Sequence, residues 1–145
     1  MYNGPNVYQA VAVQTSSPAK LVVMLYEGAI RFLRESVQAI ESKDLERKRQ
    51  SVDRAVAIVQ HLAGTLDMEQ GGAVAADLYR LYGYMMSRIL EGSAKLETAP
   101  IEEVIKLLGV VLNGWEELTK KDHQSAVTTP LLSRQTSGNG LELHV

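Results

Sequence analysis

The residues of this chain that could take part in chemistry are few and scattered. Its three histidines, His61, His123 and His144, are widely separated, and none belongs to the Glu-x-x-His pairs with which helical bundles bind two iron ions. The chain has no cysteine, which excludes disulfides, thiol catalysis and thiolate zinc sites. We expect His61 to be a solvated residue on the polar side of its helix. The sequence therefore predicts no metal site.

One acidic pair and one glycine pair lie close together in the sequence. Asp67 and Glu69 could resemble a carboxylate site, but no base or metal ligand accompanies them. Gly71 and Gly72 lack both the GxGxxG spacing and the preceding strand of a phosphate-binding loop. The basic run at residues 47–49 lies among acidic residues, which indicates a solvated face and not a phosphate track. We expect neither enzyme activity nor a cofactor.

Composition sets the class of protein. The chain has 145 residues, 46% of them hydrophobic and 22% charged, which is typical of one globular domain. Its net charge of −2 does not suggest a nucleic-acid-binding protein, because such proteins usually carry a basic face. No apolar stretch reaches the roughly 18 residues of a membrane span. The N-terminal residues lack the pattern of a signal peptide, so we expect a cytoplasmic protein.

Helical periodicity and helix-end signals predict four helices. Ser17 followed by Pro18 is a typical helix start, and Asp44 can cap a second helix. Adjacent glycines predict a loop at residues 66–72. The predicted helices span about residues 18–42, 44–66, 73–96 and 98–121.

Four helices of this length, joined by short loops, predict an all-α, antiparallel up-down four-helix bundle. We assign residues 18–121 to the bundle. Residues 1–17 are expected to form a mobile N-terminal leader. Residues 122–145 are rich in Ser, Thr, Gly and Asn and are expected to form a disordered, flexible C-terminal tail.

The first and third helices carry more apolar surface than a four-helix core needs. The apolar residues of the second helix, from Leu45 to Leu66, cover an arc of about 160° and are expected to face the core. On the first and third helices the arc widens to about 200°. A large apolar patch on a soluble protein usually marks an interaction site. The additional residues are Val23, Tyr26, Ile30, Leu33 and Val37 on the first helix, and Tyr79, Tyr82, Met86 and Leu90 on the third.

Two interpretations of these residues stay open. They could line an exposed groove that binds an apolar peptide or helix, which the tyrosine and methionine content favours. Alternatively, the two helices could be more central in the bundle, or the leader and the tail could pack over them. In the second case several of the residues would be buried.

Three segments, in this order and spacing, resemble the family of flagellar export chaperones of the FliS type. Residues 8–30 contain SP-x-KL and MLYEGAI. Residues 66–85 contain LDMEQGG and LYGYM, and residues 102–115 contain EEV, LL and a tryptophan. The resemblance covers about residues 8–120. It implies an antiparallel four-helix bundle, in agreement with the periodicity.

The resemblance also implies a function. Members of this family bind the C-terminal segment of flagellin and keep it from polymerising in the cytoplasm before export by the flagellar type III secretion apparatus. Their leader can lie over part of the binding surface, so Tyr8 joins the nine helix residues above as a predicted partner-binding residue. Other flagellar export components are further candidate partners. An alternative is a structural homo-oligomeric adaptor, in which the same apolar surface closes a homodimer.

Overall fold

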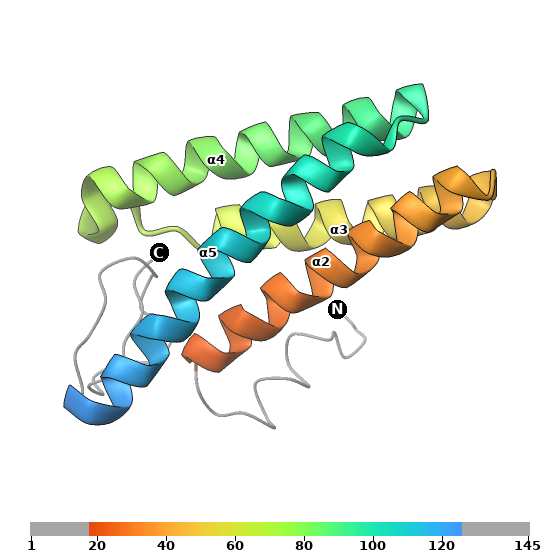
Figure 1. Ribbon diagram of the computed structural model, residues 1–145. Coiled ribbons are helices and arrows are strands. Elements are labelled where there is room, and N and C mark those ends of the chain that lie inside the picture. The colour runs from red at the N-terminus through yellow and green to blue at the C-terminus, as the bar shows by residue number, and fades with distance from the viewer. Residues whose placement is uncertain (1–17, 126–145) are drawn as a thin grey trace, which may run out of the picture.

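The computed structural model of the protein describes residues 18–125, which form four helices (Figure 1). They are α2 (Pro18–Glu41), α3 (Leu45–Gly64), α4 (Met68–Lys95) and α5 (Thr98–Ser125). Both α2 and α4 pack against α3 and against α5. The helices therefore close into a ring in which α2 and α4 lie diagonally opposite each other. The predicted all-α, antiparallel four-helix bundle is confirmed.

The boundaries of the bundle agree with the prediction at most helix ends. Pro18 begins α2, and Asp44 caps α3 by accepting a hydrogen bond from the Arg47 amide at 3.2 Å. At the other end, α5 continues to Ser125, four residues beyond the predicted end of the bundle. The leader (residues 1–17) and residues 126–145 of the tail lie outside the described residues.

The predicted loop at residues 66–72 is instead largely helical. Asp67 accepts hydrogen bonds from the Glu69 and Gln70 amides at 3.1 and 3.0 Å, so that α4 already begins at Met68. The turn formed there is separated from the rest of α4 at Gly72, whose φ of 56° and ψ of −133° are not helical. The adjacent glycines therefore correctly predicted an interruption of the helix. The capping capacity of Asp67, which supplies partners for otherwise unpaired amides, was missed.

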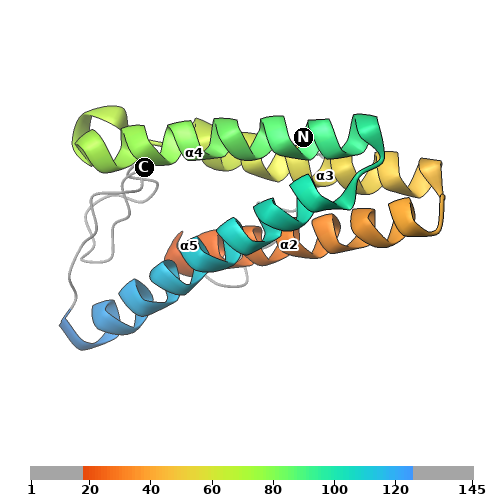
Figure 2. The ribbon, with the colours of Figure 1, turned by 45° about the horizontal axis from the view of Figure 1, so that its top comes forward.

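The turn between α4 and α5 depends on a second glycine. Leu96 ends α4 in a left-handed conformation, with φ of 57°, and the Glu97 amide donates to the Gly92 carbonyl at 2.9 Å. A Cβ atom at Gly92 would lie only 2.7 Å from the Glu97 carbonyl oxygen. The small residue thus permits the close turn from which α4 and α5 diverge (Figure 2).

The core contains a polar contact between the two diagonal helices. The hydroxyl groups of Tyr26 on α2 and Tyr82 on α4 are hydrogen-bonded to each other, and their ring centroids are 6.4 Å apart. Both side chains are almost completely buried. Burial raises the pKa of Tyr26 to about 12, although hydrogen bonding to Tyr82 and Trp115 acts in the opposite direction. Burial also raises the pKa of Tyr82, so both phenols stay protonated at neutral pH.

Apolar side chains from all four helices surround this pair. Every helix presents one buried stripe, and the four stripes form a single cluster. The largest fully buried apolar residues are Leu33, Val59, Leu62, Met85, Ile89, Ile101, Val104 and Leu108.

We predict that the two tyrosine hydroxyls stabilise the fold as a pair. Tyr26→Phe or Tyr82→Phe alone should lower the free energy of unfolding by about 1–3 kcal/mol, because each leaves a buried hydroxyl without this partner. The double variant should lose clearly less free energy of unfolding than the two single variants lose in total. Urea unfolding of the original chain and the three variants measures this. Tyr79→Phe, on the exposed side of α4, is the control and should change little. Strictly additive losses would contradict the pairing.

Candidate functional site

The predicted partner-binding residues fall into three groups in the structure. Four are buried in the core: Tyr26, Ile30, Leu33 and Tyr82. Val23, Val37 and Met86 are half-buried. Tyr79 and Leu90 are 56% and 53% exposed. Tyr8 lies outside the described residues. Only members of the second and third groups are accessible to a partner while the bundle stays closed.

The predicted residues of α2 lie on the side of that helix that faces α5. The opposite side faces α3, since a Cβ atom at Gly28 would lie 3.4 Å from Ile58 Cδ1. Ile30 comes two positions after Gly28, about 200° around the helix. Val23 and Val37 are each two turns from Ile30 and share its side. The accessible residues of α2 therefore border the seam between α2 and α5.

The predicted residues of α4 lie on the side that faces α3. Arg88 marks the other side, because its Nε donates to Glu103 Oε1 on α5 at 2.7 Å. Met86 and Leu90 are each two positions from Arg88, about 200° around the helix. Tyr79 is two turns before Met86. The two predicted stripes thus lie on opposite sides of the bundle and do not meet in one groove.

The helix α3 contributes apolar residues beside the α4 stripe. Arg47 and Arg54 reach from α3 to α2, where Arg47 pairs with Glu35 at 3.4 Å and Arg54 stacks on a phenyl ring. Leu45 and Val56 are each two positions from one of these arginines and so lie on the opposite side, beside α4. The interpretation of Leu45 as a core residue was wrong, since it is 53% exposed.

A contact between α3 and α4 fixes how their residues align. Lys48 Nζ donates to the Ser93 carbonyl at 3.1 Å, and from there the antiparallel helices place Val56 at the level of Met86. Together the two helices line the seam between them with a strip of apolar residues, which the polar contact between Lys48 and Ser93 interrupts. We define the α3–α4 face as Leu45, Val56, Ala63, Tyr79, Met86 and Leu90.

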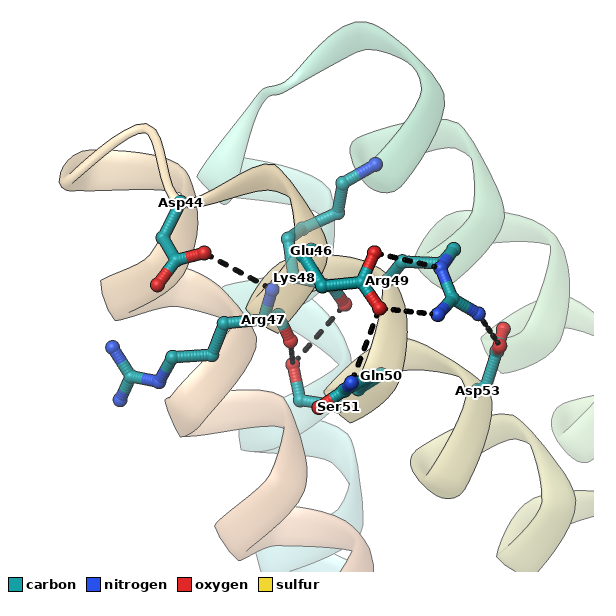
Figure 3. A network of polar contacts seen from close by, with 8 residues as sticks. All are labelled: Asp44, Glu46, Arg47, Lys48, Arg49, Gln50, Ser51 and Asp53. Carbon is teal, nitrogen blue, oxygen red and sulfur yellow. Dashed lines mark hydrogen bonds and ion pairs between the residues drawn. The ribbon is translucent and has the colours of Figure 1, made fainter.

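Three charged residues near the start of α3 are paired with one another. Figure 3 shows Arg49 held between Glu46, at 2.5 Å, and Asp53, at 3.3 Å. This arginine lowers the pKa of Glu46, and Gln50 donates a further hydrogen bond to it. On α4 the exposed Asp77 and Arg80 pair in the same way. In these groups each arginine is held by at least one carboxylate.

A second apolar area was missed by sequence reasoning. Val110 on α5 is 65% exposed and lies two turns after Glu103, on the side that faces α4. Val74 on α4 is also exposed, on the side of Arg88. The two valines border the region where α4 and α5 diverge. The seven-residue spacing from Glu103 to Val110 could have indicated this position.

The residues considered for chemistry do not assemble. Between residues 18 and 125, no three His, Cys, Asp or Glu side chains come together as metal ligands. His61 is on an exposed side of α3, as expected, and partial burial lowers its pKa. None of the helices α2 to α5 is long and apolar enough to span a membrane.

Comparison with known proteins identifies relatives. Residues 1–122 match the family described as "Flagellar protein FliS". The chain is 30% identical to the flagellar secretion chaperone FliS of Bacillus subtilis, over 84% of this chain and 90% of the relative. It is 33% identical to FliS of Salmonella typhimurium, over 76% of this chain and 82% of the relative. It is 35% identical to FliS of Campylobacter jejuni, over 78% of this chain and 88% of the relative.

We predict that the exposed members of the α3–α4 face do not stabilise the fold. Tyr79→Gln combined with Leu90→Gln should change the free energy of unfolding by no more than about 1 kcal/mol, because both side chains already contact water. It should also reduce the binding of an apolar fluorescent dye, since less apolar surface is exposed. The control Ile89→Gln, one position from Leu90 but buried, should unfold the bundle. If the Tyr79→Gln/Leu90→Gln variant lost as much free energy of unfolding as Ile89→Gln, both residues would belong to the core.

Proposed function

This chain belongs to the FliS family of flagellar proteins, and we propose that it is a cytoplasmic chaperone for the C-terminal region of flagellin. In this proposal it covers that region, prevents premature polymerisation and supports export by the flagellar type III secretion apparatus. The curated relatives are flagellar secretion chaperones by name. Because the family is one of chaperones, the chain is not an enzyme.

The α3–α4 face is the observation that carries the proposal. It gathers three residues predicted from the sequence, Tyr79, Met86 and Leu90, along two parallel rows of apolar side chains. From Tyr79 to Leu90 the strip extends about 16 Å, which accommodates about three turns of a client helix. A segment that forms filaments is expected to be amphipathic, and an apolar groove binds the apolar side of such a helix. Covering that side blocks self-association.

The remaining predicted residues have different roles in this proposal. Val23 and Val37 would contact a client that continues around the bundle to the seam between α2 and α5. The buried residues act through the positions of α2 and α4 and not by direct contact in the closed bundle. They are Tyr26, Ile30, Leu33 and Tyr82.

The leader is proposed to act as a lid. Tyr8, Val11 and Val13 are apolar residues that precede α2 in the sequence and could occupy the binding surface when no client is bound. Part of the client's binding energy would then be used to displace them.

We predict that a carboxylate on the α3–α4 face weakens client binding. Leu90→Asp should raise the Kd for a purified C-terminal flagellin segment at least about tenfold, because a buried, unpaired charge faces an apolar client. The control Asn113→Asp adds the same charge on an exposed position of α5 and should leave the Kd within about twofold. Calorimetric titration measures both. An unchanged Kd for Leu90→Asp would exclude this face.

Molar mass in solution separates the proposal from the homo-oligomeric alternative. A chaperone should be a single chain of 15.9 kDa that forms a complex when flagellin is added. A stable homodimer whose association is abolished by Leu90→Asp, without flagellin binding, would instead favour the adaptor.

We predict that removal of residues 1–14 raises client affinity or speeds association, because the face is then permanently open. The truncated protein should also self-associate more strongly through the exposed apolar surface. Calorimetry and stopped-flow fluorescence on the full-length and truncated chains will measure these effects. Clearly weaker client binding by the truncated chain would reject the lid and place Tyr8 in the bound interface.

A further inference from the structure

Two arginines share one aromatic ring at the seam between α2 and α3. The guanidinium carbon of Arg31, on α2, lies 5.3 Å from the centroid of the Phe32 ring. That of Arg54, on α3, lies 5.7 Å from the same centroid. Cation–π contacts of this kind hold guanidinium groups in place. They also bring two positive charges together at one point of the surface.

Within residues 18–125, neither arginine has a carboxylate partner. The acidic residues closest in sequence are used elsewhere or stay apart: Glu35 pairs with Arg47, and Asp53 pairs with Arg49. Glu27, one turn before Arg31, is exposed and forms no ion pair with another of the described residues. This differs from the start of α3, where Arg49 is enclosed by acidic residues (Figure 3). The seam therefore offers two positioned groups of donors to an external anion.

The residues between and beside the arginines are apolar. Gly28 has no side chain, and a Cβ atom there would lie 3.4 Å from Ile58 Cδ1 and 3.8 Å from Arg31 Nη2. Phe32 and Ile58 are half-buried, and Met24, one turn before Gly28, is 39% exposed. Gly28 itself is buried beneath Ile58 and Arg31. An apolar side chain could lie over Met24 and Ile58 while flanking carboxylates meet the guanidinium groups.

We propose that this seam docks an acidic amphipathic segment of a partner protein. Carboxylates of the segment bind the guanidinium groups of Arg31 and Arg54, a pairing that planar guanidinium groups favour. Apolar side chains of the same segment cover Met24 and Ile58. The apolar residues at the seam favour a peptide over a nucleic acid, and the net charge of −2 gives no overall attraction for a phosphate backbone.

This seam is separate from the α3–α4 face. Arg54 and Val56 are two positions apart on α3 and so point to opposite sides of that helix. The bundle can therefore bind an apolar client on one side of α3 and an acidic partner on the other. The inference does not depend on the identity of the client.

The test uses a panel of fluorescent helical peptides that carry leucines one turn apart, with glutamates at neighbouring positions. The same peptides with glutamine in place of glutamate are the uncharged comparison. Binding to the full chain is measured by anisotropy, and the contacted residues are mapped by amide chemical shifts. Inorganic phosphate and a short single-stranded DNA are tested in parallel. Measurements at about 0.1 M and about 1 M salt compare Debye lengths of about 10 and 3 Å.

The matched variants have equal changes in charge. The double variant Arg31→Glu/Arg54→Glu should raise the Kd of the glutamate peptide that binds most tightly at least about tenfold, because attraction between the charges becomes repulsion. Lys106→Glu with Lys120→Glu, on exposed positions of α5, should change it by no more than about twofold. Arg31→Gln with Arg54→Gln tests the loss of charge without repulsion. Circular dichroism checks that each variant is folded.

The expected result is binding by a glutamate peptide that is lost in the seam variants and at high salt, with shifts centred on Gly28 and Ile58. Three results would overturn the proposal. One is that no peptide of the panel binds. Another is that the Lys106→Glu/Lys120→Glu control loses peptide binding to the same extent, or that the amide chemical shifts change on a different face of the bundle. The third is tighter binding of phosphate or DNA than of any peptide.

Discussion

The hydrogen bond between Tyr26 and Tyr82, together with the buried apolar stripes beside it, constrains which sides of α2 and α4 face outward. These helices are diagonal in the ring, so their facing sides are set by contacts through the middle of the bundle. Because both hydroxyls are buried, rotating either helix would leave an unpaired polar group in an apolar core. Rotation is therefore restricted, and residues such as Leu90 stay on the surface.

The helix α3 separates two surfaces of different chemistry. On the side of α4, Leu45 and Val56 extend an apolar strip whose neighbouring charges are paired. On the side of α2, Arg31 and Arg54 stack on Phe32 without a carboxylate partner among the described residues. Two residues that are two positions apart on α3, such as Arg54 and Val56, belong to different surfaces. The proposed client face and the proposed seam for an acidic partner therefore lie on opposite sides of α3.

Local signals allowed much of the fold to be predicted, whereas the site needed tertiary information. Pro18 and Asp44 mark helix starts through local chemistry, so the sequence located them well. On the third helix, the 200° apolar arc includes the exposed Tyr79 and Leu90, whereas on the first helix three of the five additional residues are buried. However, helical periodicity does not say which neighbour covers which edge. Tyr82 and Tyr79 were therefore placed in one stripe, although only Tyr79 is accessible. Leu45 was placed in the core because it lies within the apolar arc of the second helix. The arc does not show that Leu45 is at the end of α3, where fewer neighbouring residues cover it.

The central claim is that the α3–α4 face contacts the C-terminal segment of flagellin. The most direct measurement is methyl NMR of the chain, labelled at Met and Leu methyl groups and bound to an unlabelled flagellin segment. Intermolecular contacts are predicted from the methyl groups of Met86, Leu90 and Leu45, and none from the buried Leu33. Contacts confined to other faces of the bundle, with Met86 and Leu90 unaffected, would contradict the claim.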